Sequence, residues 1–194
     1  MAATGGDEQL WDHLPYGPWP DREEFGSWLG ERRASRDPWF HAVVPTDSGV
    51  ASGMLALQRC DAANDVIEVG HIWFGPRLQR TTAATEALAL VARHIFEDLG
   101  HRRLEWKCNA ANARSRRAAL RLGFRFEGIF RQHQVVKGHN RDTAWYSILD
   151  REWPAARAAY DAWLDPANFD AAGRQRQSLS ALTSAARRQI DGEA

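Results

Sequence analysis

Two hydrophobic periodicities follow one another in the middle of the chain, and their order is the strongest constraint on the fold. Residues 103–108 alternate polar and apolar side chains, as a strand with one buried face does. Residues 82–99 place apolar side chains at spacings of three and four, and Gly100 follows where a helix would end. Because residues 66–74 also form a predicted strand, the long helix connects two strands. The order strand, helix, strand favours a parallel pair.

The rest of the chain adds antiparallel strands and further helices. The predicted strands are residues 40–44, 50–57, 66–74, 103–108, 124–136 and 143–149, of which the last two pair as a hairpin. The predicted helices are residues 21–34, with Asp21 as the N-cap, 82–99, 113–122 and 155–164, followed by a weaker last helix from about Leu179. We therefore predict an α/β fold of the α+β, three-layer type, with a mixed central sheet of about six or seven strands.

The length of 194 residues is typical of one domain with an appendage. We predict three divisions: an N-terminal segment (residues 1–20), a main domain (residues 21–153) and a C-terminal helical extension (residues 154–194).

Composition excludes several classes of protein. No run approaches the roughly 18 apolar residues of a membrane span, and the first residues have neither a basic nor an apolar targeting region, so we expect a cytoplasmic protein with no membrane partner. Cys60 and Cys108 are too few for a disulfide framework, and the seven histidines lack metal-ligand spacing, so we predict no metal. Nine tryptophans and the C-terminal helices lead us to predict a homodimer.

The formal net charge is zero, but the charges are unevenly distributed. Residues 1–70 carry 5 basic and 12 acidic side chains, whereas residues 71–149 carry 14 and 6. A positive segment attracts anions, and the candidates are a phosphorylated cofactor, nucleic acid or the acidic first third of this chain. The chain has only two lysines and no basic arm, so we expect no nucleic-acid partner.

A loop of small residues leads from the predicted strand at residues 66–74 into the helix at residues 82–99. Small side chains let backbone amides approach a ligand, and the unpaired amides and the dipole of a helix N-terminus attract anions. Arg80 lies in this loop and has a guanidinium suited to phosphate. An ordinary connection with threonine caps has the same composition, so the loop by itself leaves both interpretations open.

Other motifs favour the anion site. The chain reads Glu68-Val69-Gly70 before the loop, Asn109-Ala110-Ala111-Asn112-Ala113-Arg114-Ser115 after the next strand, and Arg121-Leu122-Gly123-Phe124-Arg125-Phe126-Glu127-Gly128 beyond it. Together with the loop, these motifs resemble the GNAT acyltransferase superfamily, and within it the RimJ/RimL-like branch, over residues 39–153. The resemblance implies that acetyl-CoA binds where two neighbouring parallel strands splay apart, and that its acetyl group goes to a protein amino terminus or a small amine.

The resemblance also assigns residues to the cofactor. The implied contacts are Trp73, Phe74, Gln79, Arg80, Thr81, Thr82, Ala83, Ala84, Thr85, Asn109, Asn112 and Ser115. The backbone near Trp73 and Phe74 would polarise the thioester carbonyl, and the amides from Gln79 to Ala84 would hold the pyrophosphate. Thr82 stands where the family usually has glycine. Because a β-branched residue resists positive φ, Thr82 fits only if it already lies in the helix.

Acetyl transfer to an amine needs a base, because only the neutral amine attacks a thioester. The resemblance places Glu68 as the catalytic base, acting through water, with a cross-strand ion pair as its alternative role. Glu127 is the rival base, with structural hydrogen bonding as its alternative, and His71 is either a base or a core residue. The departing thiolate needs a proton; where many relatives have tyrosine, this chain offers Ser115, which otherwise only caps a helix.

Two questions stay open in the sequence. A non-catalytic domain that binds CoA as a sensor or interaction module is the alternative to an enzyme, because Thr82 and the missing tyrosine depart from the family pattern. The acceptor walls are expected around His133, Gln134, His139 and Arg141. The acidic first third favours a cationic acceptor, such as an amino terminus, a polyamine or an aminoglycoside.

Overall fold

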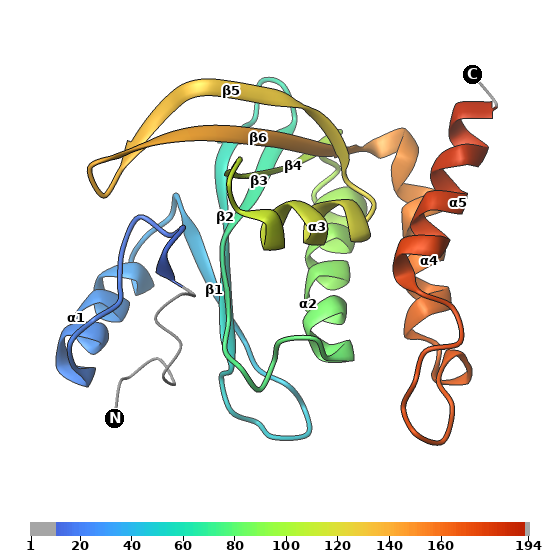
Figure 1. Ribbon diagram of the computed structural model, residues 1–194, viewed down its shortest axis with the longest axis horizontal. Coiled ribbons are helices and arrows are strands. Elements are labelled where there is room, and N and C mark those ends of the chain that lie inside the picture. Colours follow the sequence, from blue (N-terminus) through green and yellow to red (C-terminus); the bar gives the residue numbers. More distant parts are fainter. Residues whose placement is uncertain (1–10, 193–194) are drawn as a thin grey trace.

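The structure is a computed structural model that describes residues 11–192, and it has a six-stranded sheet (Figure 1). The strands are β1 (Trp39–Val43), β2 (Gly53–Asp61), β3 (Val66–Phe74), β4 (Arg103–Asn109), β5 (Arg125–Val136) and β6 (His139–Leu149). The α-helices are α1 (Arg22–Arg33), α2 (Thr82–Arg93), α3 (Ala113–Arg121), α4 (Trp153–Leu164) and α5 (Leu179–Gly192). A π-helical turn, η2 (His94–Asp98), follows α2, and the 3-10 turns η3 (Asp150–Glu152) and η4 (Pro166–Asn168) flank α4.

The sheet order is β1-β2-β3-β4-β6-β5. The neighbours β3 and β4 are parallel, and the other neighbouring strands run antiparallel. This arrangement confirms the predicted mixed sheet with a parallel pair joined by a long helix. Helix α1 lies on one side of the β1 to β3 half of the sheet, whereas α2, α4 and α5 lie on the other side (Figure 1).

Most predicted elements occur within a few residues of their expected bounds, and the differences have local causes. Asp21 caps α1 as predicted. The helix expected over residues 82–99 changes to a π-helical turn after Arg93, and Gly100, with a φ of +69°, follows its end. The strand expected from residue 50 begins three residues later, at Gly53, because the turn after β1 extends through this exposed segment.

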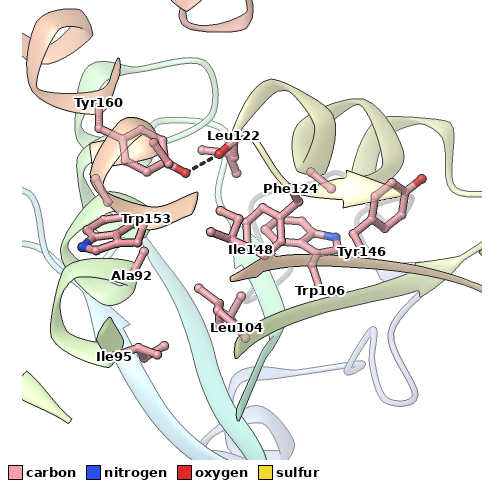
Figure 2. Close-up of a cluster of buried hydrophobic side chains, with 14 of the residues drawn as sticks. Ala92, Ile95, Leu104, Trp106, Leu122, Phe124, Tyr146, Ile148, Trp153 and Tyr160 are labelled. Atoms are coloured by element: carbon pink, nitrogen blue, oxygen red, sulfur yellow. Dashed lines mark hydrogen bonds between the residues drawn. The ribbon is translucent and has the colours of Figure 1, made fainter. Parts of the chain in front are cut away.

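The hydrophobic core lies on the side of the sheet that α2, α3 and α4 cover (Figure 2). Alternate residues of β2, β3, β4 and β6 enter it, among them Leu104 and Trp106 of β4. The C-terminal helices belong to the same cluster, to which they contribute Trp153, Tyr160, Trp163 and Leu179. The C-terminal segment therefore packs on the main domain. Within residues 11–192, every helix is too short or too polar to span a bilayer.

Aromatic side chains attach the segment before α1 to the outer face of β3. Trp11 is fully buried and stacks on Trp73 with 5.1 Å between ring centroids. Tyr16 stacks on His71 at 5.5 Å and meets Trp28 of α1 at 4.5 Å. Such contacts add to the free energy gained by burying the rings. Some of the nine tryptophans therefore cover the sheet on the side away from the main core.

A substitution at Tyr160 tests whether α4 stabilises the end of α3. Its buried hydroxyl donates to the backbone oxygen of Leu122, the C-cap of α3 (Figure 2). Tyr160→Phe should lower the free energy of unfolding by about 1–3 kcal/mol, because it leaves a buried carbonyl without a partner.

Tyr146→Phe is the matched control. The Tyr146 hydroxyl accepts a hydrogen bond from Arg116 Nε, a donor that can turn to water. Its loss should therefore reduce stability by less than about 1 kcal/mol. Urea unfolding measures both variants, and equal losses would contradict the role given to Tyr160.

Candidate active site

The parallel strands β3 and β4 pair only along their first halves. Val66 to Val69 align with Arg103 to Trp106, and the pairing stops there. Beyond that point β3 continues beside β2, and β4 continues beside β6. The parallel pair is therefore splayed, as the resemblance implied.

A β-bulge in β3 accounts for the splay. Met54 pairs with Trp73 and Ala56 pairs with Gly70, so β3 has one residue more than β2 between these two pairs. His71 lies in this interval with a φ of +51°. A bulge bends its strand and increases the local twist. The bend thus directs the second half of β3 away from β4.

A cleft of about 780 Å³ opens where the strands part, which is within the usual size range of small-molecule sites. Leu88, Ser115 and Ala118 line it from α2 and α3, while Glu68 and Arg141 line it from β3 and β6. The edge of β3 beyond Val69 presents backbone groups that β4 leaves unpaired. Such groups need partners, so the cleft suits an extended ligand that carries amides of its own.

The loop before α2 has the geometry of an anion site. Thr81 is the N-cap, and its hydroxyl oxygen accepts from Ala84 N over 3.2 Å. Arg80 takes the left-handed conformation, with a φ of +63°, while Thr82 is the first helical residue and has no positive φ. The threonine at the usual glycine position therefore causes no backbone strain. Apart from Ala84 N, the first amides of α2 have no intrahelical acceptor and remain available to an anion.

The implied cofactor residues fall into two groups. Trp73, Phe74, Gln79, Asn109, Asn112 and Ser115 line the cleft. Arg80, Thr81, Thr82, Ala83 and Ala84 form the loop and first turn that follow Gln79. Thr85 is different, because it is buried and its hydroxyl accepts from Arg121 over 3.1 Å. Its side chain is therefore engaged within the protein.

Ser115 lies in the first turn of α3 and lines the cleft. Asn112 caps this helix by accepting from Ser115 N over 3.0 Å, so the capping role belongs to the asparagine. The Ser115 hydroxyl oxygen accepts from Trp106 Nε1 over 3.0 Å. Because a hydroxyl also has one proton to donate, Ser115 can donate toward the cleft.

Glu68 is a buried carboxylate at the point where the strands part, 3% exposed. Its Oε2 lies 3.2 Å from the Arg59 guanidinium and 3.0 Å from Lys107 Nζ. Its Oε1 accepts from Gln58 Nε2 over 2.8 Å. Each carboxylate oxygen can accept two hydrogen bonds, so Oε1 keeps capacity for a further donor. In the sequence, a cross-strand ion pair was the alternative to a catalytic role for Glu68. In the structure, Glu68 forms ion pairs and also lines the cleft.

His71 belongs to a directed chain of hydrogen bonds that ends on Glu68. Since Gln58 Nε2 donates to the carboxylate, Gln58 Oε1 accepts from His71 Nε2 over 3.0 Å. His71 Nδ1 then accepts from the Tyr16 hydroxyl over 2.8 Å. Burial lowers the pKa of His71 to about 4 and raises that of Tyr16. His71 is therefore a partly buried residue that lines the cleft with both ring nitrogens engaged in hydrogen bonds.

Glu127 lies outside the described lining of the cleft. Arg103 donates to both of its oxygens and the Ser147 hydroxyl donates over 2.6 Å. These hydrogen bonds from Arg103 hold the pKa of Glu127 below its ordinary value. Glu127 thus has the structural hydrogen bonding that was its alternative role, and its place outside the described lining leads us to keep Glu68 as the proposed base.

The charges around the cleft differ from those expected of the acidic first third. Glu68 is the one carboxylate among the described lining residues. The cationic lining residues are Arg59, Lys107, Arg114 and Arg141. Lys107 is almost fully buried between Glu68 and Glu105, with its Nζ 3.9 Å from the centroid of the Trp145 ring. The expected attraction of a cationic acceptor by acidic residues therefore has no basis in the lining.

The sequence interpretation missed Gln58, Arg59 and Lys107 as site residues. Lys107 lies at a polar position of an alternating strand, on the same face as Glu105. That pattern gives the face but not the register with β3. Among the predicted acceptor walls, His133, Gln134 and Arg141 line the cleft, whereas His139 is absent from its described lining.

Comparison with known proteins adds to this geometry. The family model described as "Acetyltransferase (GNAT) domain" matches residues 2–125. A crystal structure of a GCN5-related N-acetyltransferase from Brucella melitensis is 53% identical, with a TM-score of 0.89, over 91% of this chain and 80% of that one. A Bacillus subtilis (strain 168) protein named "Putative ribosomal N-acetyltransferase YdaF" is 26% identical over 69% of this chain and 82% of its own. The "Ribosomal-protein-serine acetyltransferase" of Escherichia coli (strain K12) is 28% identical over 52% and 56%.

The depressed pKa of His71 predicts a pH dependence of stability. The ordinary pKa is 6.5 and that in the fold is about 4. As the pH falls from 6.5 to 4, the imidazole of His71 becomes protonated in the unfolded chain but stays neutral in the folded chain. Stability that is present above pH 6.5 is therefore lost toward pH 4, by on the order of 3 kcal/mol.

His71→Asn is the variant that isolates this effect, because asparagine tolerates a positive φ. Its free energy of unfolding should be lower at pH 8 and should fall less between pH 6.5 and 4. Denaturant unfolding at a series of pH values measures both slopes. Parallel slopes would show that another group causes the acid sensitivity.

Proposed function

Because the chain belongs to the GNAT acetyltransferase family, we propose that it transfers an acetyl group from acetyl-CoA to a primary amine, by direct attack in a ternary complex. The amine is that of a protein N-terminus or of a small molecule. The observation that supports the proposal is the splay of β3 and β4, which opens a cleft lined by Gln79, in the loop before α2, and by the buried carboxylate of Glu68.

The residues present fit acetyl-CoA. The free amides at the start of α2 and the guanidinium of Arg80 would hold the pyrophosphate. The unpaired edge of β3 near Trp73 and Phe74 would bind the amides of the pantetheine arm, as an added strand would. Bound there, acetyl-CoA supplies an acetyl group activated as a thioester.

Glu68 is the proposed base. Its Oε1 has capacity to accept a further hydrogen bond, while Oε2 is held by Arg59 and Lys107. Because the carboxylate is buried, the proton reaches Oε1 from the amine through a water molecule. Ser115 donates a hydrogen bond to the thiolate that departs, since its oxygen is fixed by Trp106.

Free thiol released from acetyl-CoA in the presence of an amine panel is the direct test. If CoA raises the melting temperature and no amine releases thiol, the chain is a CoA-binding module without catalysis, which the lack of tyrosine in α3 favours. Salt-sensitive retention of oligonucleotides without either effect would indicate nucleic-acid binding.

Substitutions of Glu68 and Ser115 should lower the rate of acetyl transfer by different amounts. Glu68→Gln should lower kcat by at least about 100-fold, because the general base is lost. Ser115→Ala should lower kcat about tenfold, the value of one hydrogen bond made late in the reaction.

Glu127→Gln is the matched control, and its kcat should stay within about twofold while the free energy of unfolding falls. Calorimetry with CoA confirms that each variant still binds the cofactor. A Glu127→Gln enzyme as inactive as Glu68→Gln would overturn the assignment of the base.

The homodimer also remains a proposal. Strand β5 is at the edge of the sheet, and Ile129 and Phe130 are exposed on it; such edges tend to pair with another chain. We expect sedimentation velocity to show a dimer at micromolar concentration. Ile129→Lys should shift the protein toward monomer, whereas Val50→Lys, at an exposed apolar residue elsewhere, should not. If sedimentation of the unmodified protein shows only monomer, the homodimer proposal is wrong.

A further inference from the structure

We propose that the acceptor carries an anionic group, a carboxylate, in addition to its amine, and that the guanidinium of Arg141 binds this group. The inference rests on the proposed function and names the class of acceptor that the same cleft takes.

Arg141 is a partly buried cation without a described ion-pair partner. It lines the cleft, and its Nε is buried without a hydrogen-bond partner among residues 11–192. No ion pair joins it to a carboxylate within the same residues, whereas Arg59 and Lys107 both pair with Glu68. Burial also lowers the pKa of Arg141. A charge held partly out of water without a partner costs free energy, so an anion brought by a ligand would relieve that cost.

The side chain belongs to the acceptor side of the sheet. Along β6, Ala144, Tyr146 and Ile148 enter the core beneath the helices. Successive residues of a strand point to opposite faces, so Arg141 shares the other face with Thr143. That hydroxyl bonds to His133 over 2.9 Å, and His133 also lines the cleft. The phosphate-binding start of α2 is on the helix side, which separates Arg141 from the cofactor phosphates.

Charge balance points to the same class of acceptor. Among the described lining residues, Arg59, Lys107 and Arg141 accompany a single carboxylate, Glu68, and Lys107 has a second partner, Glu105, outside the lining. Glu68 is already shared by the first two cations. A polyamine would add positive charge to this wall, whereas an amine with a carboxylate supplies the missing negative charge. A planar guanidinium is suited to hold a carboxylate through two hydrogen bonds.

Free amino acids and acidic peptides both offer this chemistry, and matched acceptors distinguish them. The first panel pairs each free amino acid with its carboxamide. The second panel pairs peptides that carry Asp or Glu directly after the first residue with peptides that carry Asn or Gln there. For at least one pair, we expect kcat/KM for the carboxylate to exceed that for the amide by tenfold or more. The panel in which the preference occurs identifies the source of the carboxylate.

Variants assign the preference to Arg141. Arg141→Gln should raise KM for the preferred carboxylate acceptor 10- to 100-fold with little change in kcat, and should leave the amide within about twofold. Arg141→Lys should restore part of the affinity, because it returns the charge without the planar fork. Arg131→Gln removes an exposed cation of β5 outside the described lining and should change neither acceptor.

Several results would overturn the inference while the proposed function stands. These are equal use of carboxylates and amides, an equal effect of Arg141→Gln on both, or a loss of CoA affinity in that variant. If no acceptor releases thiol, calorimetry on the CoA-saturated protein decides, because preferential binding of a carboxylate that Arg141→Gln abolishes supports the site and its absence rejects it. Failure of the proposed function is distinct: the unmodified protein then neither binds CoA nor releases thiol.

Discussion

The parting of β3 and β4 is the constraint on which the rest of the site depends. Strands that part inside a sheet leave backbone groups unpaired, and this arrangement lasts only where other groups satisfy or shield them. The bulge at His71 bends β3, and the aromatic residues before α1 pack on the bent segment from outside. The opening joins the helix side of the sheet to its polar face. A ligand held at α2 can therefore meet a second molecule beside Glu68.

The polar face of the sheet carries a chain of alternating charges, and this chain separates the two candidate carboxylates. Its members, in order, are Arg59, Glu68, Lys107, Glu105, Arg103 and Glu127. Each inner member has partners of opposite sign on both sides, which offsets the cost of burial. Glu68 lies where the strands part and Glu127 lies at the far end, and both oxygens of each carboxylate receive donors. The two carboxylates therefore differ in position, because Glu68 lines the cleft and Glu127 lies outside its described lining.

The sequence predicted what depends on local patterns and missed what depends on register. Periodicity placed the strand at residues 66–74 and the start of the long helix, and capping chemistry identified Asp21. The engagement of Thr85 by Arg121 joins residues 36 apart, and the contact of Glu68 with Lys107 requires the alignment of two strands. No pattern within one segment contains such information. The resemblance to a family supplied the splay, because the bulge that produces it has no signature in the residues around His71.

Net charge along the sequence was a poor guide to the electrostatics of the cleft, for a physical reason. Charges exposed to water are screened within about 10 Å, so the acidic side chains of the first third act mainly on their own surroundings. Between partly buried charges screening is weaker, so each pairing counts individually. Arg59 and Lys107 form ion pairs with Glu68, whereas Arg141 forms none with a described residue and its Nε lacks a described hydrogen-bond partner. The character of an acceptor should therefore be inferred from the lining charge that lacks a partner, and not from the sum over a segment.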